Sequence, residues 1–197
     1  FRKVTYYPVT PKTEVRIANA YNNLGVIAQN ENKYDLAKGL YLKAKSVKEA
    51  QKDTVGIAYA MVNLGNVYHY EGNFNTAIQN YHSALNSLEN QKSSTSESLK
   101  RLIYDNLSVS YDSLKDYENA YKNVLRSKEL YEQINRERLA ENLAAGSYGG
   151  SRTRENADGI PLCRSHFELS GMKRLFQLEF TAAARYRKMP SAYRTLA

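Results

Sequence analysis

Three asparagines at corresponding places along the chain are the residues best suited to hold a ligand. Asn23, Asn63 and Asn106 each stand one position before a leucine within a helical pattern. A carboxamide both donates and accepts hydrogen bonds, so it can satisfy a peptide group whose water has been displaced. The alternative interpretation is that these asparagines satisfy polar groups between helices, with or without a ligand.

The residue types that usually perform catalysis or bind metals form no recognisable set. His69, His82 and His166 are far apart, and no HExxH pattern joins them. The glycine patterns that hold phosphates and the GxSxG turn of serine hydrolases are absent from the sequence. Cys163 is the one cysteine, which excludes an intramolecular disulfide framework. The sequence therefore predicts no enzyme, no metal site and no cofactor.

The asparagines belong to a pattern of small and aromatic residues that is clearest in the middle of the chain. Leu64 and Tyr68, followed by a stop signal at Gly72, indicate one amphipathic helix. Aromatic and alanine residues at three- and four-residue steps then indicate a second helix, with alanines where the two helices touch. The residues of this second helix are Phe74, Ala77, Tyr81 and Ala84.

Two further copies of the pattern flank the middle one, and the repeat leucines Leu24, Leu64 and Leu107 are 40 and 43 residues apart. The upstream copy has Tyr21, Leu24, Gly25, Tyr34, Ala37, Tyr41 and Ala44. The downstream copy has Tyr104, Leu107, Tyr111, Tyr117 and Ala120, but Ser108, Val124 and Ser127 replace the glycine, the aromatic residue and the last alanine. The pattern resembles the tetratricopeptide repeat, with the longer spacing found in bacterial signalling and regulatory proteins.

The resemblance implies an all-α fold, an α-α superhelix (solenoid) of three helical hairpins with a long C-terminal helix. We expect an extended lead-in over residues 1–12 and three repeats over 13–145, at about 13–50, 53–90 and 94–145. Residues 146–197 have a different composition, with seven arginines, two lysines and one asparagine. We interpret this Arg-rich tail as disordered or as a non-native segment such as a junction, with a native appendage as the alternative.

Several residues predict where helices begin and end. The first helix is expected to run to about Asn30, and Asn32 stands at the turn position that Gly72 occupies in the middle copy, where a left-handed backbone is needed. Lys115 fits that position less well. Asp53 is predicted to cap the following helix, and the pair Ser94 and Glu97 predicts a capping box at the start of the third copy.

A net charge of +8 would by itself suggest nucleic-acid binding, but most of this charge lies in the tail. Residues 1–145 contain 19 basic and 16 acidic side chains, whereas the tail contains 9 and 4. The repeats thus lack a basic stripe, and we expect no nucleic-acid binding through them. No apolar run is long enough to span a membrane. A cytoplasmic location is favoured, and a periplasmic one applies if a signal peptide lies upstream.

The resemblance also implies where a partner would bind. In this family the first helices line a concave groove, here with the residues Asn22, Asn23, Tyr59, Asn63, Asn66, His69, Tyr70, Asp105, Asn106 and Asp112. Family members that clamp a C-terminal carboxylate use basic residues at the equivalents of Asn22, Leu102 and Asn106, which this chain lacks. We therefore expect a non-catalytic scaffold that binds a neutral or basic protein or peptide.

A second interpretation of the repeats remains open. They resemble the sensory or regulatory part of bacterial signalling proteins, such as histidine kinases and transcriptional regulators. In that case the partner would be an output domain of the same polypeptide, outside this sequence.

Overall fold

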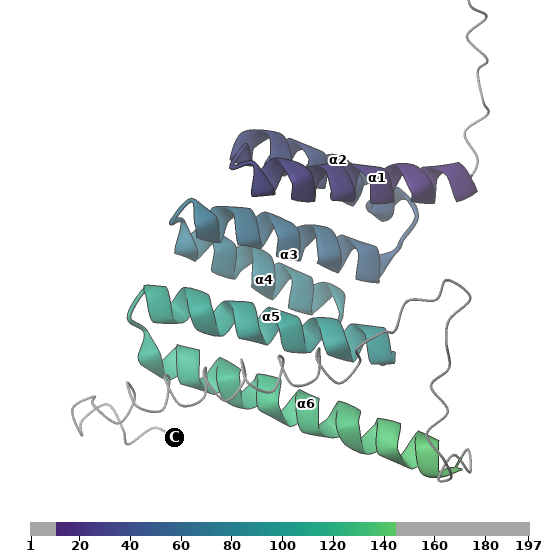
Figure 1. Cartoon of the computed structure of the whole chain (residues 1–197), viewed down its shortest axis with the longest axis vertical. Helices are drawn as coiled ribbons and strands as arrows, with labels where there is room; N and C mark the ends of the chain where they lie inside the picture. Colours follow the sequence, from purple (N-terminus) through teal and green to yellow (C-terminus); the bar gives the residue numbers. More distant parts are fainter. Residues whose placement is uncertain (1–10, 145–197) are drawn as a thin grey trace, which may run out of the picture. The chain divides into compact units, whose positions relative to one another are not determined.

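The computed structural model describes residues 11–144, which form six α-helices and no strand (Figure 1). The all-α prediction is confirmed. The helices are α1 (Pro11–Asn30), α2 (Tyr34–Ala50), α3 (Thr54–Tyr70), α4 (Phe74–Ser87), α5 (Ser94–Ser113) and α6 (Tyr117–Ala144). They pair as a first hairpin (α1 and α2), a second (α3 and α4) and a third (α5 and α6). The chain divides into two compact units, and α1 to α4 belong to the first, α5 and α6 to the second.

The turn within each hairpin uses one residue with a left-handed backbone. Asn32 has a φ of 59° and Gly72 a φ of 79°, as their residue types predict. Lys115 takes the same conformation with a φ of 62°, although lysine is poorly suited to it. Lys52, between α2 and α3, also has a positive φ, which its residue type does not predict.

The starts of α3 and α5 are fixed by side-chain caps. The Asp53 carboxylate accepts a hydrogen bond from the Gly56 N–H at 2.8 Å, as predicted for a helix cap. The predicted capping box at Ser94 and Glu97 is wrong by one position. Ser93 is the cap, and its side chain and that of Ser96 each accept a hydrogen bond from the other residue's backbone N–H. In a run of adjacent serines, residue type alone does not select the capping one.

Each of the first two hairpins is closed by a tyrosine that lies on a glycine. A Cβ atom added to Gly25 would come within 2.5 Å of the Tyr41 ring, and one added to Gly65 would come equally near the Tyr81 ring. Both tyrosines are fully buried. The glycine of the repeat pattern is therefore required because the ring of the second helix occupies the space of its missing side chain. Burial raises the pKa of Tyr41 to about 12.

The third hairpin has a different pair at the same two places. Ser108 replaces the glycine and Val124 replaces the tyrosine, with the same separation of 16 residues along the chain. Both side chains are buried. In the first two hairpins a Cβ at the glycine position would overlap the tyrosine ring, so the smaller valine at position 124 agrees with a serine at position 108.

Within the first unit the two hairpins stack through α2 and α3. Leu64 and Val67 of α3 join a buried cluster with Ala37 and Tyr41 of α2, together with Ala28 of α1. Beside this cluster the Lys38 ammonium pairs with the Glu71 carboxylate at 2.8 Å and lies over the Tyr68 ring. The hydrogen bonds that the Lys38 ammonium donates to Glu71 and Asp35 raise the pKa of Lys38.

The predicted lead-in and tail fall mainly outside the described residues.

Candidate functional site

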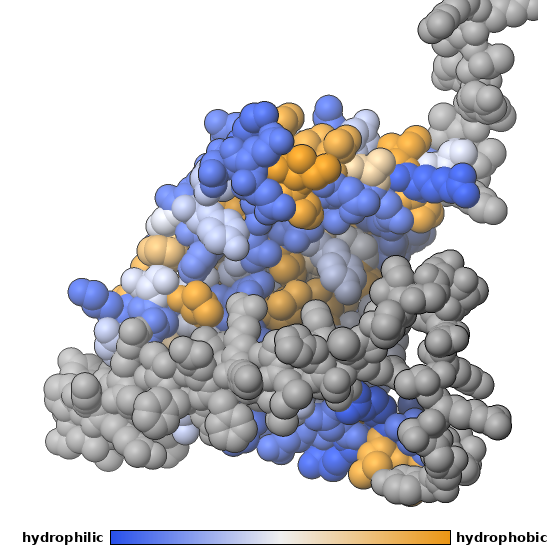
Figure 2. All heavy atoms as spheres, in the orientation of Figure 1, coloured by the Kyte–Doolittle hydropathy of each residue, from blue (hydrophilic) through white to orange (hydrophobic). Residues whose placement is uncertain are grey.

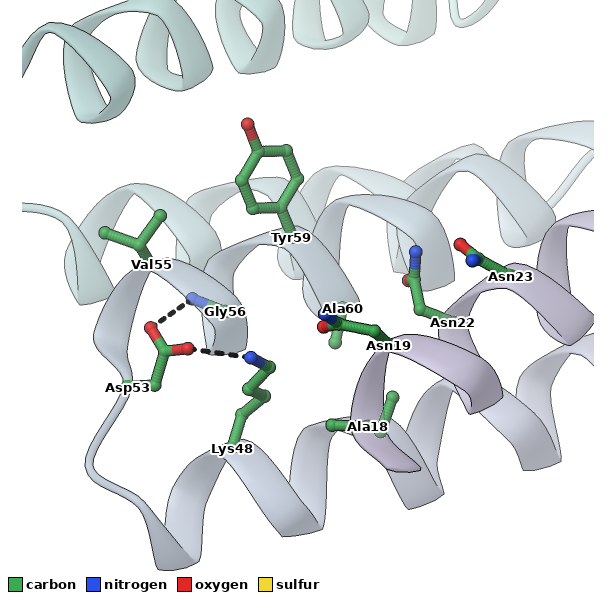
Figure 3. Close-up of a pocket in the computed structure, with 11 residues that line it drawn as sticks. Ala18, Asn19, Asn22, Asn23, Lys48, Asp53, Val55, Gly56, Tyr59 and Ala60 are labelled. Carbon is green, nitrogen blue, oxygen red and sulfur yellow. Dashed lines mark hydrogen bonds and ion pairs between the residues drawn. The ribbon is translucent and has the colours of Figure 1, made fainter. Parts of the chain in front are cut away.

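A pocket of about 400 Å³ lies in the first unit, between α1, the end of α2 and the start of α3 (Figure 3). Three asparagines of α1 line it together with residues from the junction of α2 and α3. The lining residues are Ala18, Asn19, Asn22, Asn23, Ala44, Lys48, Asp53, Val55, Gly56, Tyr59 and Ala60. Of the predicted groove residues, the structure brings three together here: Asn22, Asn23 and Tyr59.

The α1 side of the pocket is polar because Asn19, Asn22 and Asn23 are arranged at helical steps of three and four residues. The side chains of Asn19 and Asn23 are exposed, and that of Asn22 is partly buried. On the opposite side the Tyr59 ring projects from α3 and is 43% exposed (Figure 3). The pocket therefore combines hydrogen-bonding amides with an aromatic surface.

Lys48 and Asp53 give one end of the pocket a fixed ion pair. The Lys48 ammonium lies 2.9 Å from the Asp53 carboxylate, whose other oxygen accepts the Gly56 N–H (Figure 3). Partial burial alone would raise the pKa of Asp53, but the Gly56 and Lys48 hydrogen bonds bring this pKa below its usual value. Because the two charges neutralise each other, this end of the pocket attracts neither anions nor cations strongly.

Asn63 is tied to the pocket through Asn22. Its Nδ2 donates to Asn22 Oδ1 at 2.7 Å, which links α3 to α1 across 41 residues of sequence. This contact corresponds to the second interpretation of the repeated asparagines, in which they satisfy polar groups between helices. Asn23, the first copy's counterpart of Asn63, is exposed instead.

Asn66 has a structural contact as well. Its Oδ1 accepts a hydrogen bond from the Tyr81 hydroxyl at 2.8 Å, and Gln29 accepts from the Tyr41 hydroxyl at 3.1 Å in the first hairpin. Each buried tyrosine thus finds an amide of the neighbouring helix for its polar end. The repeat pattern does not reveal this pairing. With a repeat of 40 residues, Gln29 corresponds to position 69 and not to Asn66.

His69 and Tyr70 lie at the far end of α3. The His69 ring packs edge-on against Phe74 with ring centroids 5.1 Å apart, and burial lowers the pKa of this histidine. Tyr70 is largely exposed. Neither residue lines the pocket at the start of α3.

The remaining predicted residues belong to α5 in the second unit. Asn106 and Asp112 are partly buried. Asp105 was expected to face a ligand, but it is only 5% exposed, and its Oδ1 accepts a hydrogen bond from the Ser127 hydroxyl of α6 at 2.6 Å. Its other oxygen lies 3.4 Å from Arg101 Nη1. Asp105 therefore holds α5 to α6, and its buried carboxylate does not face a basic ligand as the sequence predicts.

The repeat numbering gives two different signals for Asp105. Its equivalent in the second hairpin, Val62, is buried, whereas its equivalent in the first hairpin, Asn22, lines the pocket. Asn19, Lys48 and Val55 are pocket residues that the sequence analysis missed. Asn19 is the counterpart of Tyr59, 40 residues later, so the same numbering would have added it.

Comparison with known proteins agrees with the helical hairpins described above. Residues 16–90 match the family model described as tetratricopeptide repeat. This segment is a tetratricopeptide repeat region. The match covers the pocket and both hairpins of the first unit, and the spacing of its repeat leucines is 40 residues.

Comparison with solved structures finds a chain of similar fold. The chain is similar to the crystal structure of BtubC (BKLC) from P. vanneervenii, with 22% sequence identity and a TM-score of 0.53. The similarity covers 73% of this chain and 54% of that one, so the chain corresponds to about half of the solved structure. At this identity the likeness shows the fold alone. No curated protein matches the sequence.

None of the helices in residues 11–144 is both long and apolar enough to cross a membrane. Within the same residues, histidine, cysteine and acidic side chains form no group of three or more that could hold a metal ion.

Proposed function

We propose that the tetratricopeptide repeats bind a peptide segment of a partner protein along α1 and α3, with the asparagine-lined pocket at the centre of the site. The observation that supports this proposal is the row of amides from Asn19, Asn22 and Asn23 along an open pocket. Amides in a row suit the repeating donors and acceptors of a peptide backbone, because each can pair with either kind of group.

The pocket also favours a particular ligand. Its ion pair, Lys48 and Asp53, is internally neutral, so the site offers no charge for a terminal carboxylate or a phosphate. Tyr59 and Val55 provide apolar surface beside the amides. We therefore expect an extended, uncharged segment with one apolar side chain in the pocket and its backbone along α1. Of the neutral and basic ligands that the sequence predicts, the pocket thus favours the neutral ones.

A displayed library of random peptides, selected on the full chain, would supply a ligand for titration by fluorescence anisotropy. Replacing Asn19 or Asn23 by alanine should each remove a hydrogen bond to the ligand and weaken binding about threefold to tenfold. Both side chains are exposed, so neither change should alter the free energy of unfolding much. Asn86→Ala, at an exposed asparagine of α4 outside the pocket, is the matched control and should bind like the wild type.

Asn63→Ala separates the two interpretations of the repeated asparagines. This change removes the bond to Asn22 between α3 and α1, so it should lower the stability of the first unit by about 1 kcal/mol as well as the affinity. A loss of stability with unchanged affinity would make Asn63 purely structural. Equal losses of affinity in the Asn19, Asn23 and Asn86 variants would contradict the proposed site.

A further inference from the structure

The side chains that α3 leaves exposed are two tyrosines. Figure 2 shows apolar side chains in several places on the surface that α1 and α2 form, so exposure on these two helices does not single out a site. In contrast, α3 packs against α1, α2 and α4, and of its 17 residues only Tyr59 and Tyr70 are exposed, by 43% and 61%. Aromatic side chains usually bury much of their surface, so both rings are placed where a ligand can cover them.

The two tyrosines belong to one stripe along α3. Steps of four, three and four residues place on one side of this helix Tyr59, Asn63, Asn66 and Tyr70. The amides between the rings are fixed by hydrogen bonds, one to an asparagine of α1 and one to a buried tyrosine of α4. The rings are attached eleven residues apart, which separates them by about 16 Å at 1.5 Å per residue.

Each of these tyrosines has an asparagine as its counterpart on α1, 40 residues earlier. Asn19 is the counterpart of Tyr59 and lines the same pocket, and Asn30 is the counterpart of Tyr70. Both asparagines are exposed. The combination that forms the pocket, an amide on α1 and a ring on α3, therefore recurs three helical turns further along.

The Tyr70 ring is supported by two other aromatic rings. His69 packs edge-on against it with ring centroids 6.1 Å apart, and the His69 ring also contacts Phe74 at 5.1 Å. These contacts restrict the Tyr70 side chain, so it loses less freedom when a ligand covers it. Glu71, which follows Tyr70, is paired with Lys38 at 2.8 Å, so the charges beside this ring neutralise each other as they do in the pocket.

We propose that Asn30 and Tyr70 form a second subsite for the peptide that binds at the asparagine-lined pocket, and that this peptide has two apolar side chains, one on each tyrosine. The inference rests on the proposed function and specifies its ligand. An extended chain rises about 3.3 Å per residue, so the two apolar side chains should be about five residues apart. Between the two subsites the helices present only amides and one apolar side chain, so the ligand should be uncharged there as well. These residues are Asn22, Asn23 and Val26 of α1 and Asn63 and Asn66 of α3.

Selection from a displayed library of random peptides on the full chain tests this ligand. The wild type should enrich peptides with two apolar residues about five positions apart. Tyr70→Ala should enrich peptides that keep only one of them, and it should bind a wild-type-selected peptide about tenfold more weakly in fluorescence anisotropy. Tyr70→Phe keeps the ring and should bind like the wild type. Leu42→Ala, at an exposed side chain of α2 outside both rows, is the matched control.

A change of spacing in the peptide tests the two subsites together. Inserting two glycines between the apolar residues of a selected peptide should weaken its binding to the wild type about tenfold and leave its binding to Tyr70→Ala unchanged. Circular dichroism and urea unfolding would verify that the variants keep the fold, as expected for an exposed side chain.

Two results would overturn the second subsite. If Tyr70→Ala binds the selected peptides as tightly as the wild type while Asn19→Ala weakens them, the second subsite is wrong and the proposed function stands. If selection on the wild type enriches no peptide, the proposed function and the second subsite fail together.

Discussion

In the first two hairpins a buried tyrosine ring lies on a glycine of the neighbouring helix, whereas the third hairpin has valine and serine at those places. A second pair of positions also changes between the hairpins. Val62 and Ala84, both buried and apolar in the second hairpin, correspond to Asp105 and Ser127 in the third, which are joined by a hydrogen bond. In each pair both residues differ between the hairpins. The side chain at one position therefore depends on the side chain that faces it from the neighbouring helix.

The largest effect is expected in the polar pair of the third hairpin. Ser127→Ala would leave the buried Asp105 carboxylate without its hydroxyl donor and should lower the free energy of unfolding by about 3 kcal/mol. Adding Asp105→Val reproduces the apolar pair of the second hairpin and should recover most of this loss. Urea unfolding followed by circular dichroism measures both. A double variant as unstable as the sum of the two single variants would show that the pair is not coupled.

The next effect concerns the glycine contact. Gly65→Ala would place a methyl group against the buried Tyr81 ring and should destabilise the protein by about 2 kcal/mol. Gly39→Ala is the matched control, because a Cβ at this exposed helical glycine meets no atom within 4 Å. It should be neutral, or stabilising by up to about 1 kcal/mol, since alanine is the better helix former. Similar losses at both glycines would refute the ring contact.

The hairpins differ in a smaller way at the starts of their helices. The residue before α2, Lys33, makes no side-chain cap, whereas Asp53 caps α3. Asp53→Ala should therefore cost about 1 kcal/mol, and Lys33→Ala should cost almost nothing. Because the folded-state pKa of Asp53 is lowered, its contribution is complete above about pH 4 and is lost as pH falls through that lowered value. Unfolding measured across this acidic range should show the loss in the wild type and not in Asp53→Ala.

The smallest expected effect is a pH dependence confined to the second hairpin, which contains His69 and His82. Burial lowers the pKa of both histidines, so the unfolded chain binds protons more readily than the folded one. Stability should be complete above about pH 6.5 and fall as the solution is acidified through the lowered pKa values. His69→Gln should flatten this dependence in urea titrations at neutral and mildly acidic pH. An unchanged slope would mean that His69 does not contribute.

Much of this fold could be predicted from residue types at helical spacing. The all-α hairpins, the left-handed turns at Asn32 and Gly72 and the cap at Asp53 are each determined by local physical chemistry. The glycine contact was missed because its reason, a ring 16 residues away in sequence, exists only once two helices are packed. Sequence alone does not decide the role of Asn63 for a similar reason, since an amide suits a ligand and a neighbouring helix equally well.

The contact between glycine and tyrosine also limits the order in which a repeat can change during evolution. A pair such as Gly65 and Tyr81 can become a pair such as Ser108 and Val124 only through two substitutions, and one of them must come first. Serine beside the tyrosine would force atoms into overlap, whereas valine beside the glycine would leave a cavity, which a folded chain tolerates better when its stability reserve is sufficient. The accessible path therefore loses the aromatic ring before it gains the hydroxyl, and a lineage leading to the third hairpin would have passed through a glycine–valine intermediate.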